Sequence, residues 1–261
     1  MTVLAPPGFP DRLPPCHEVL LTCPQPEAVS DTVVSDTHGF HVRIGSTEYG
    51  VLPVTGATGT GKTIATQAIV SGWLAVNPAS ELVTFEPHGC DDYNRLVDAH
   101  QTHRRLYSVE EATAYLARLA YSTAAEPDQD ATARLIVLVS PPVGATPSGP
   151  YDAVNGSSMA RAVAGFWLTV GDLARSQRPD VRLIIVQQTP HPTLPALSAS
   201  APATTGVLLG TPSTAAWNHV FPWDPIPSEM DFWLASFRPT GYGWVKTTPG
   251  IPPRLVQFPA P

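Results

Sequence analysis

The stretch that decides the fold reads Gly56-Ala57-Thr58-Gly59-Thr60-Gly61-Lys62-Thr63. It is a complete phosphate-binding loop, or P-loop, of the pattern G-x-x-x-x-G-K-T. Its glycines let the backbone fold around a phosphate so that successive N–H groups point at it, and the positive end of the following helix adds to the attraction. The chain has only two lysines, so a lysine at this position argues against a chance match.

The pattern gives each residue of this loop a role. The residues predicted to contact the nucleotide are Gly56, Ala57, Thr58, Gly59, Thr60, Gly61, Lys62, Thr63 and Ile64. Lys62 would reach the β- and γ-phosphates, and the Thr63 hydroxyl would ligate Mg²⁺. An apolar run over 51–55 precedes the loop, and helical spacing over 64–70 follows it. We therefore predict ATP and Mg²⁺ as ligands; a glycine- and threonine-rich surface turn is the alternative.

Composition excludes several classes of protein. A chain of 261 residues with 43% hydrophobic residues can form one α/β domain with extensions or two small domains. The net charge of −7 argues against a wholly basic nucleic-acid-binding surface, but it leaves room for a local basic pore. The three cysteines, Cys16, Cys23 and Cys90, are too scattered for a disulfide framework. No apolar run reaches the roughly 18 residues of a membrane span, and residues 1–15 lack the pattern of a signal peptide. We expect a cytoplasmic protein without membrane insertion.

Three regions are predicted along the chain. Residues 1–30 form a proline-rich N-terminal arm, residues 31–258 form one nucleotide-binding domain, and residues 259–261 form a tail. Inside the domain, the segment 140–158 is rich in Pro, Gly and Ser, which predicts a long mobile loop. Such loops inside compact domains are usually functional.

The apolar pattern of the domain alternates between strands and helices. Strands are expected over 51–55, 81–85, 134–139, 181–186 and 207–209, and helices over 64–70, 109–120 and about 160–176. A small hairpin is expected within 41–50, and a closing hairpin is expected from 243–246 and 255–257. Alternating strands and helices, with a P-loop after the first core strand, predict a RecA-like α/β domain with a mainly parallel central sheet flanked by helices.

Four stretches resemble the FtsK/SpoIIIE branch of the FtsK–HerA ATPases. Residues 54–63 match the family's P-loop in the residues used as well as in their spacing. Phe85-Glu86-Pro87-His88-Gly89 resembles the end of its second strand. The strand end over 183–190 resembles the family's Ala-Thr-Gln-Arg-Pro, and 241–245 with 253–257 resembles its glycine-rich closing hairpin. The likeness covers about residues 40–258.

The resemblance implies an ATPase that assembles into a ring, expected to be a hexamer, and translocates double-stranded DNA. One departure favours an alternative. The family's third strand ends in Asp-Glu, where Asp organises Mg²⁺ and Glu polarises the attacking water, but here the strand runs into Ser140-Pro141. The alternative is therefore a degenerate nucleotide-binding subunit with a structural or regulatory role, similar to a secretion-ATPase module.

Hydrolysis requires a carboxylate close to the attacking water. The candidate is Glu86, at the end of the strand 81–85, which we expect to neighbour the P-loop strand. Ligands bind at such strand ends in open α/β sheets, and the catalytic Glu of RecA-like recombinases occupies a similar position. Alternatively, Glu86 only caps the turn before Pro87. Asp91 and Asp92 could supply a second acid, although their pattern is typical of turns.

Four further residues complete the predicted site. Gln188 would contact the γ-phosphate or its water as a polar sensor, although a polar residue at a strand end is ordinary. Ser140 could hold the hydration shell of Mg²⁺, or it could simply begin a loop. Arg175 or Arg178 would act across a subunit interface, as ring ATPases require. The pair Arg104-Arg105 is typical of a solvated charged face.

Overall fold

The computed structural model describes residues 32–36, 41–44, 51–87, 93–94, 100, 102–122, 133–142, 158–176, 178, 180–188, 206–210, 212–222, 224–226, 241–246 and 252–258. The predicted arm and tail, residues 143–157 of the predicted loop, and Asp91 and Asp92 lie outside these residues. Within them, every helix is too short or too polar to cross a bilayer.

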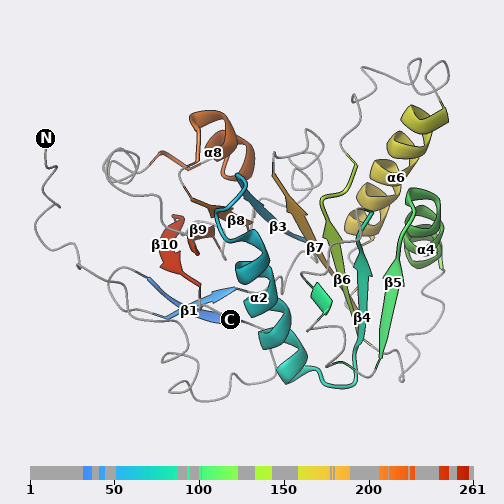
Figure 1. The fold of residues 1–261 in the computed structure, drawn as a ribbon, viewed down its shortest axis with the longest axis horizontal. Helices are drawn as coiled ribbons and strands as arrows, with labels where there is room; N and C mark the ends of the chain where they lie inside the picture. The colour runs from blue at the N-terminus through green and yellow to red at the C-terminus, as the bar shows by residue number, and fades with distance from the viewer. Residues whose placement is uncertain are drawn as a thin grey trace, which may run out of the picture.

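The strands form one ten-stranded sheet in the order β2-β1-β10-β9-β8-β3-β7-β6-β4-β5 (Figure 1). The parallel part of the sheet consists of β8 (Gly206–Leu209), β3 (Val51–Gly56), β7 (Val181–Gln187), β6 (Arg134–Val139), β4 (Glu81–Phe85) and β5 (His103–Leu106). The antiparallel extension consists of β9 (Tyr242–Lys246), β10 (Arg254–Gln257), β1 (Thr32–Asp36) and β2 (His41–Ile44). Most strands of the parallel part are continuous apolar runs, as expected where helices cover both faces.

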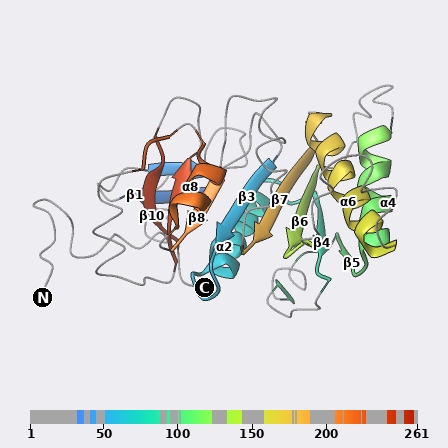
Figure 2. The same ribbon diagram turned by 90° about the horizontal axis from the view of Figure 1, so that it is seen from above.

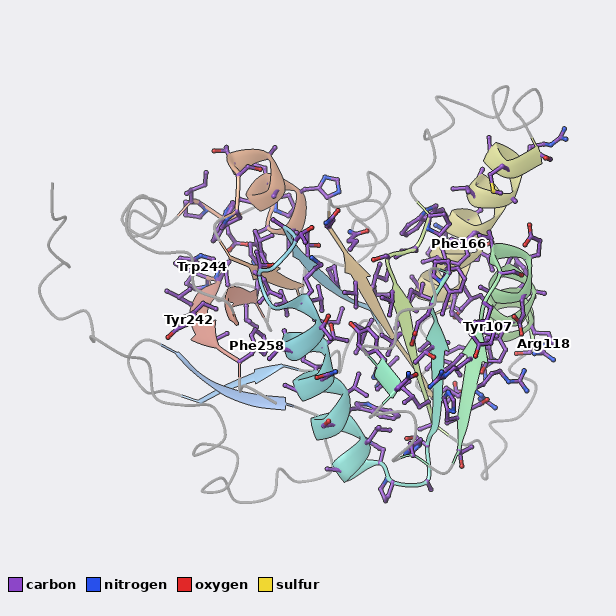
Figure 3. All side chains as sticks on the ribbon, viewed as in Figure 1. Tyr107, Arg118, Phe166, Tyr242, Trp244 and Phe258 are labelled. Carbon is purple, nitrogen blue, oxygen red and sulfur yellow. The ribbon has the colours of Figure 1, made fainter. Side chains whose placement is uncertain are left out.

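Helices cover both faces of this sheet. Helix α2 (Lys62–Val76) packs on one face, where Val54 contacts its apolar side. Helices α4 (Val109–Tyr121), α6 (Ser158–Arg175) and α8 (Thr214–Val220) pack on the other face. Alternation along the strands defines the two faces, since Val207 belongs to the core under α2 and Leu208 to the core under α8. Helices α4 and α6 lie side by side (Figures 1 and 2), and Phe166 points from α6 towards the strands (Figure 3).

The predicted RecA-like α/β sheet is confirmed, and its main strands and helices fall where the sequence places them. Three elements were not predicted, β1, β5 and α8. The hairpin expected within 41–50 lies earlier in the chain, because β2 pairs with β1 instead. Strand β5 has a single buried apolar residue, Leu106, and lies at the edge of the sheet, so its sequence carries little strand periodicity.

A ladder of opposite charges joins the amino ends of the parallel strands. Arg104 on β5 lies 3.8 Å from Glu81 on β4, and Glu81 lies 3.2 Å from Arg134 on β6. Arg134 lies 3.2 Å from Asp180, just before β7, and Arg178 lies 2.9 Å from the same carboxylate. Burial would raise the pKa of Asp180, but its hydrogen bonds from Arg178 and the nearby charges hold that pKa below its usual value. The ladder therefore fastens four adjacent strands in register.

Replacing Arg134 by methionine should lower the free energy of unfolding by about 1–3 kcal/mol. The side chains of Glu81 and Asp180 are only 19% and 13% exposed, and they would lose the cation that they share. Urea unfolding measures the change. Arg161→Met, at an exposed position of α6, is the matched control and should cost less than about 0.5 kcal/mol. Equal losses for both variants would show that the ladder contributes nothing.

Candidate functional site

The P-loop connects the carboxyl end of β3 to the first turn of α2. Gly59 has φ 79° and Gly61 has φ 95°, both in the left-handed region that favours glycine. At Gly56, an added Cβ would lie 2.6 Å from Thr60 Oγ1, so a side chain does not fit there. Gly61 is the N-cap of α2 and provides no side-chain cap. The first N–H groups of this helix are therefore suited to an anion.

The Lys62 side chain folds back over the loop. Its Nζ donates hydrogen bonds to the carbonyl oxygens of Gly56 and Ala57, both at 2.8 Å. Burial lowers the pKa of Lys62 from its usual value, and an anion held by the loop would oppose that effect. The ammonium group is thus held at the loop by backbone oxygens, where it can bind phosphate.

Two glycines next to β8 and β9 lie close to Thr60 of the P-loop. The N–H of Gly241 donates to Thr60 O at 3.0 Å, and the N–H of Gly210 donates to Tyr242 O at 2.9 Å. Gly210 has φ 73°, and a Cβ added there would lie 2.5 Å from Thr60 Cγ2. The closing hairpin, which the sequence predicted from strand patterning and from a family likeness, therefore has a physical role: Gly241, just before its first strand, binds the Thr60 carbonyl.

Gly210→Ala should weaken ATP binding about tenfold, which corresponds to about 1.4 kcal/mol. The new methyl group would overlap Thr60, and the left-handed backbone adds about 1–2 kcal/mol of strain. Titration with a fluorescent ATP analogue measures the affinity. The control is Gly165→Ala in α6, where an added Cβ meets no atom within 4 Å. That change should leave affinity unaltered and raise stability by about 0.5–1 kcal/mol; similar affinities for both variants would contradict the proposed support.

Gln187, the last residue of β7, and Gln188, which follows it, lie beside the P-loop. The Gln188 side-chain amide donates to the Thr58 hydroxyl, so the structure brings this predicted sensor to the loop. Gln187 is 1% exposed, and its amide atoms have no hydrogen-bond partner among the described residues. Its register partner on β3, Thr55, is also 1% exposed, with Oγ1 likewise unpartnered. Sequence reasoning gave Gln187 no role, although a polar residue after the buried run 183–186 was a usable signal.

Ser140 follows β6 at the same edge of the sheet. Its φ of 45° is in the left-handed region, which is uncommon for a residue other than glycine. Its N–H donates to Val186 O at 2.8 Å, which fixes it beside β7. Strained backbone of this kind concentrates at functional sites. Among the described residues, no group of three or more His, Cys, Asp or Glu side chains could hold a metal ion.

Glu86 is farther from the P-loop than the sequence suggested. The expectation that β4 neighbours the P-loop strand is wrong, because β7 and β6 lie between β3 and β4. At about 4.8 Å per strand, the axes of β3 and β4 are about 14 Å apart. Glu86 is 5% exposed, and its N–H donates to Leu106 O at 3.1 Å. Phe85 packs on the α4 and α6 side, so alternation directs Glu86 to the face that carries α2.

The two predicted arginines lie near the amino ends of the parallel strands, whereas the P-loop follows the carboxyl end of β3. Arg175 ends α6 and pairs with Asp172. Arg178 pairs with Asp180 and donates to Leu119 O at 3.0 Å. Both residues precede the amino end of β7. The carboxyl end of β7 pairs with Thr55, just before the P-loop. The structure gives Arg178 a local role in joining α4 to the start of β7.

A scan against models of protein families finds no match, and a search of curated proteins finds none either. Solved structures do match. The pCW3 conjugation coupling protein TcpA, solved in monomer form with ATPγS, has TM-score 0.65 and 14% identity over 89% of this chain and 66% of that chain. The cytoplasmic domain of the Thermomonospora curvata Type VII secretion ATPase EccC has TM-score 0.59 and 12% identity over 92% and 27%. EssC (ATPases 2 and 3) from Geobacillus thermodenitrificans has TM-score 0.54 and 15% identity over 96% and 44%.

This chain spans two thirds or less of each of these three proteins. At such low identities the likeness establishes the fold alone. The structural neighbours are FtsK/SpoIIIE-type P-loop ATPases, as the sequence resemblance predicted. The chain therefore has the RecA-like fold of these P-loop ATPases.

Proposed function

We propose that this chain is a subunit of a ring motor, expected to be hexameric, that hydrolyses ATP with Mg²⁺ and translocates double-stranded DNA in the cytoplasm. The observation that carries the proposal is the P-loop itself. Its glycines hold the required backbone, Lys62 lies over the loop, and Gln188 contacts it from β7. The fold of the structural neighbours supports the motor assignment.

ATP would bind through the loop residues 56–64. Their N–H groups and the Lys62 ammonium offer donors and positive charge to the phosphates. The coupling protein among the neighbours was solved with ATPγS, which supports a nucleoside triphosphate as the ligand. Mg²⁺, when bound, would neutralise charge on the phosphates, held by the hydroxyl of Thr63 and, through water, by that of Ser140.

For hydrolysis, we assign water activation to Glu86 and γ-phosphate sensing to Gln188. Glu86 lies at the carboxyl edge of the sheet and on the face of α2, which supports the assignment. A second subunit would supply a cation for the transition state, with Arg175 as the more exposed candidate and Arg178 as the other.

A second function is favoured by one observation. Ser140 and Pro141 stand where the resemblance implies an acid pair. The proposed base, Glu86, follows β4, which is separated from the P-loop strand β3 by β6 and β7. A subunit with this arrangement could bind ATP, hydrolyse it very slowly and act as a structural or regulatory partner.

ATP turnover with Mg²⁺, measured with and without double-stranded DNA, separates the two functions. The motor predicts turnover that DNA stimulates, together with ring assembly in sedimentation experiments when ATP or DNA is added. A chain that binds ATP but stays monomeric and inactive under every condition would support the regulatory subunit. A chain that binds no ATP would contradict both.

A further inference from the structure

Two polar side chains interrupt the face of the sheet that α6 and α8 cover. On that face, Ile185 of β7 belongs to the core under α4 and α6, and Leu208 of β8 belongs to the core under α8. Thr55 of β3 and Gln187 of β7 point to the same face, because the residue before each of them belongs to the core under α2. Figures 1 and 2 show β3 and β7 between α8 and α6. The two apolar cores are therefore separated by a polar pair.

Both side chains are buried with polar atoms that need a partner. Thr55 and Gln187 are each 1% exposed. Among the described residues, neither Thr55 Oγ1 nor the two amide atoms of Gln187 has a hydrogen-bond partner. A threonine hydroxyl and a glutamine amide each offer both donors and acceptors, and burying such groups is costly unless something pairs with them. Valine and methionine would fill the same space without that cost, so the polar pair indicates a role that apolar residues cannot fill.

The geometry of the pair suits an ordered water molecule. Thr55 and Gln187 are register partners on neighbouring parallel strands. Such strands lie about 4.8 Å apart, and one water with two hydrogen bonds of about 2.8 Å each can bridge side chains at that separation. Buried waters typically make about three hydrogen bonds to groups that would otherwise be unsatisfied. Thr55 also lines a cleft of about 600 Å³ beside the P-loop, through which water can reach the pair.

The residue after each member of the pair belongs to the nucleotide site. Gly56, after Thr55, begins the P-loop. Gln188, after Gln187, donates to the hydroxyl of Thr58 in that loop. A bridge between Thr55 and Gln187 would therefore fix the end of β7, and Gln188 with it, against the start of the P-loop.

We propose that Thr55 and Gln187 hold an ordered water molecule that links β3 to β7, which makes Gln187 a positioning residue for Gln188. This inference rests on the proposed ATP binding and on γ-phosphate sensing by Gln188, and it gives a role to a residue that the sequence left without one. Only ATP carries the γ-phosphate. The bridge should therefore act on the preference for ATP over ADP, and not equally on the affinities for both nucleotides.

Thr55→Val and Thr55→Ser form a matched pair of variants, because valine keeps the shape of threonine and serine keeps its hydroxyl. Calorimetry with Mg²⁺ measures the affinities for ATP and ADP. Thr55→Val should reduce the preference for ATP about three- to tenfold, the contribution of a typical hydrogen bond. Thr55→Ser should keep the preference of the parent. Gln187→Met, which keeps the length of the side chain without its amide, should behave like Thr55→Val.

Two further measurements separate positioning from a merely structural role. The double variant Thr55→Val with Gln187→Met should unfold at the urea concentration of the parent or above it, because replacing both polar partners by apolar groups of the same shape is nearly neutral or stabilising. In a Gln188→Ala background, Gln187→Met should cause no further loss of preference, because it acts through Gln188.

Several outcomes would overturn the inference. Equal losses for Thr55→Ser and Thr55→Val would show that the hydroxyl is not the group that matters. A loss for Gln187→Met that adds to that of Gln188→Ala would show that Gln187 does not act through the sensor. A crystal structure that shows ordered solvent should place a water within hydrogen-bond distance of both Thr55 and Gln187, and a protein group between them would exclude the bridge.

The failure of this inference can be told apart from the failure of the proposed function. If the parent binds neither nucleotide, ATP binding fails and the positioning role fails with it. If the parent binds ATP and ADP equally, ATP binding stands, but the sensor and its positioning residue are wrong. If the parent prefers ATP and Gln187→Met keeps that preference, the inference about Gln187 alone is wrong.

Discussion

Replacing Lys62 by alanine is expected to abolish ATP binding. The Lys62 ammonium lies at the loop, 2.8 Å from the carbonyl oxygens of Gly56 and Ala57, and it is the cation positioned to meet the phosphates. Hydrogen bonds to charged groups contribute about 1.5–3 kcal/mol each. Losing two such hydrogen bonds from Lys62 to the phosphates would reduce ATP affinity by about 10²–10⁴-fold. Titration with a fluorescent ATP analogue measures the effect.

The control for this change is Arg118→Ala. Arg118 is an exposed cation on α4, at the outer side of the molecule (Figure 3), so its loss alters the net charge by the same amount without touching the P-loop. Its ATP affinity should equal that of the parent. Undiminished binding by Lys62→Ala would show that residues 56–63 do not form the phosphate site.

The parallel core of the fold could be predicted because its strands are long apolar runs between polar turns. The ranges 81–85 and 134–139 were predicted with the bounds that the structure shows. The seven-residue helix α8 was missed because it is too short to show helical periodicity, although Ser213 caps it by accepting from Ala216 N. Strand β5 was missed because its packing depends on a neighbour, β4, that sequence alone does not reveal.

The site could be predicted where it is local and not where it depends on strand order. The P-loop is one continuous segment, so its residues and their spacing carry the prediction. The position of Glu86 depends on β7 being inserted between β3 and β6, and a strand that comes later in the chain leaves no trace in the sequence around Glu86. Likewise, the ion pair with Asp180 gives Arg178 a structural role that its position in the sequence did not suggest.

Glu86→Gln is expected to reduce ATP turnover by about 10²–10⁴-fold, which is the usual loss when a positioned general base is removed. The amide has the same shape and cannot accept the proton of the attacking water. ATP affinity should persist, because β4 contributes nothing to the P-loop and is separated from β3 by β7 and β6. Steady-state turnover with Mg²⁺ and DNA, together with a binding titration, measures both quantities.

The matched control is Glu81→Gln, the same substitution on the same strand at the opposite end. Glu81 pairs with Arg134 in the charge ladder, so its replacement should lower stability and leave turnover per folded molecule unchanged. If Glu86→Gln turns over ATP like the parent, Glu86 caps the turn before Pro87 and another group activates the water. If the parent itself shows no turnover with DNA and Mg²⁺ present, the chain binds ATP without hydrolysing it. The physical reason would then be Ser140-Pro141, which stands where the family resemblance implies an Asp-Glu pair.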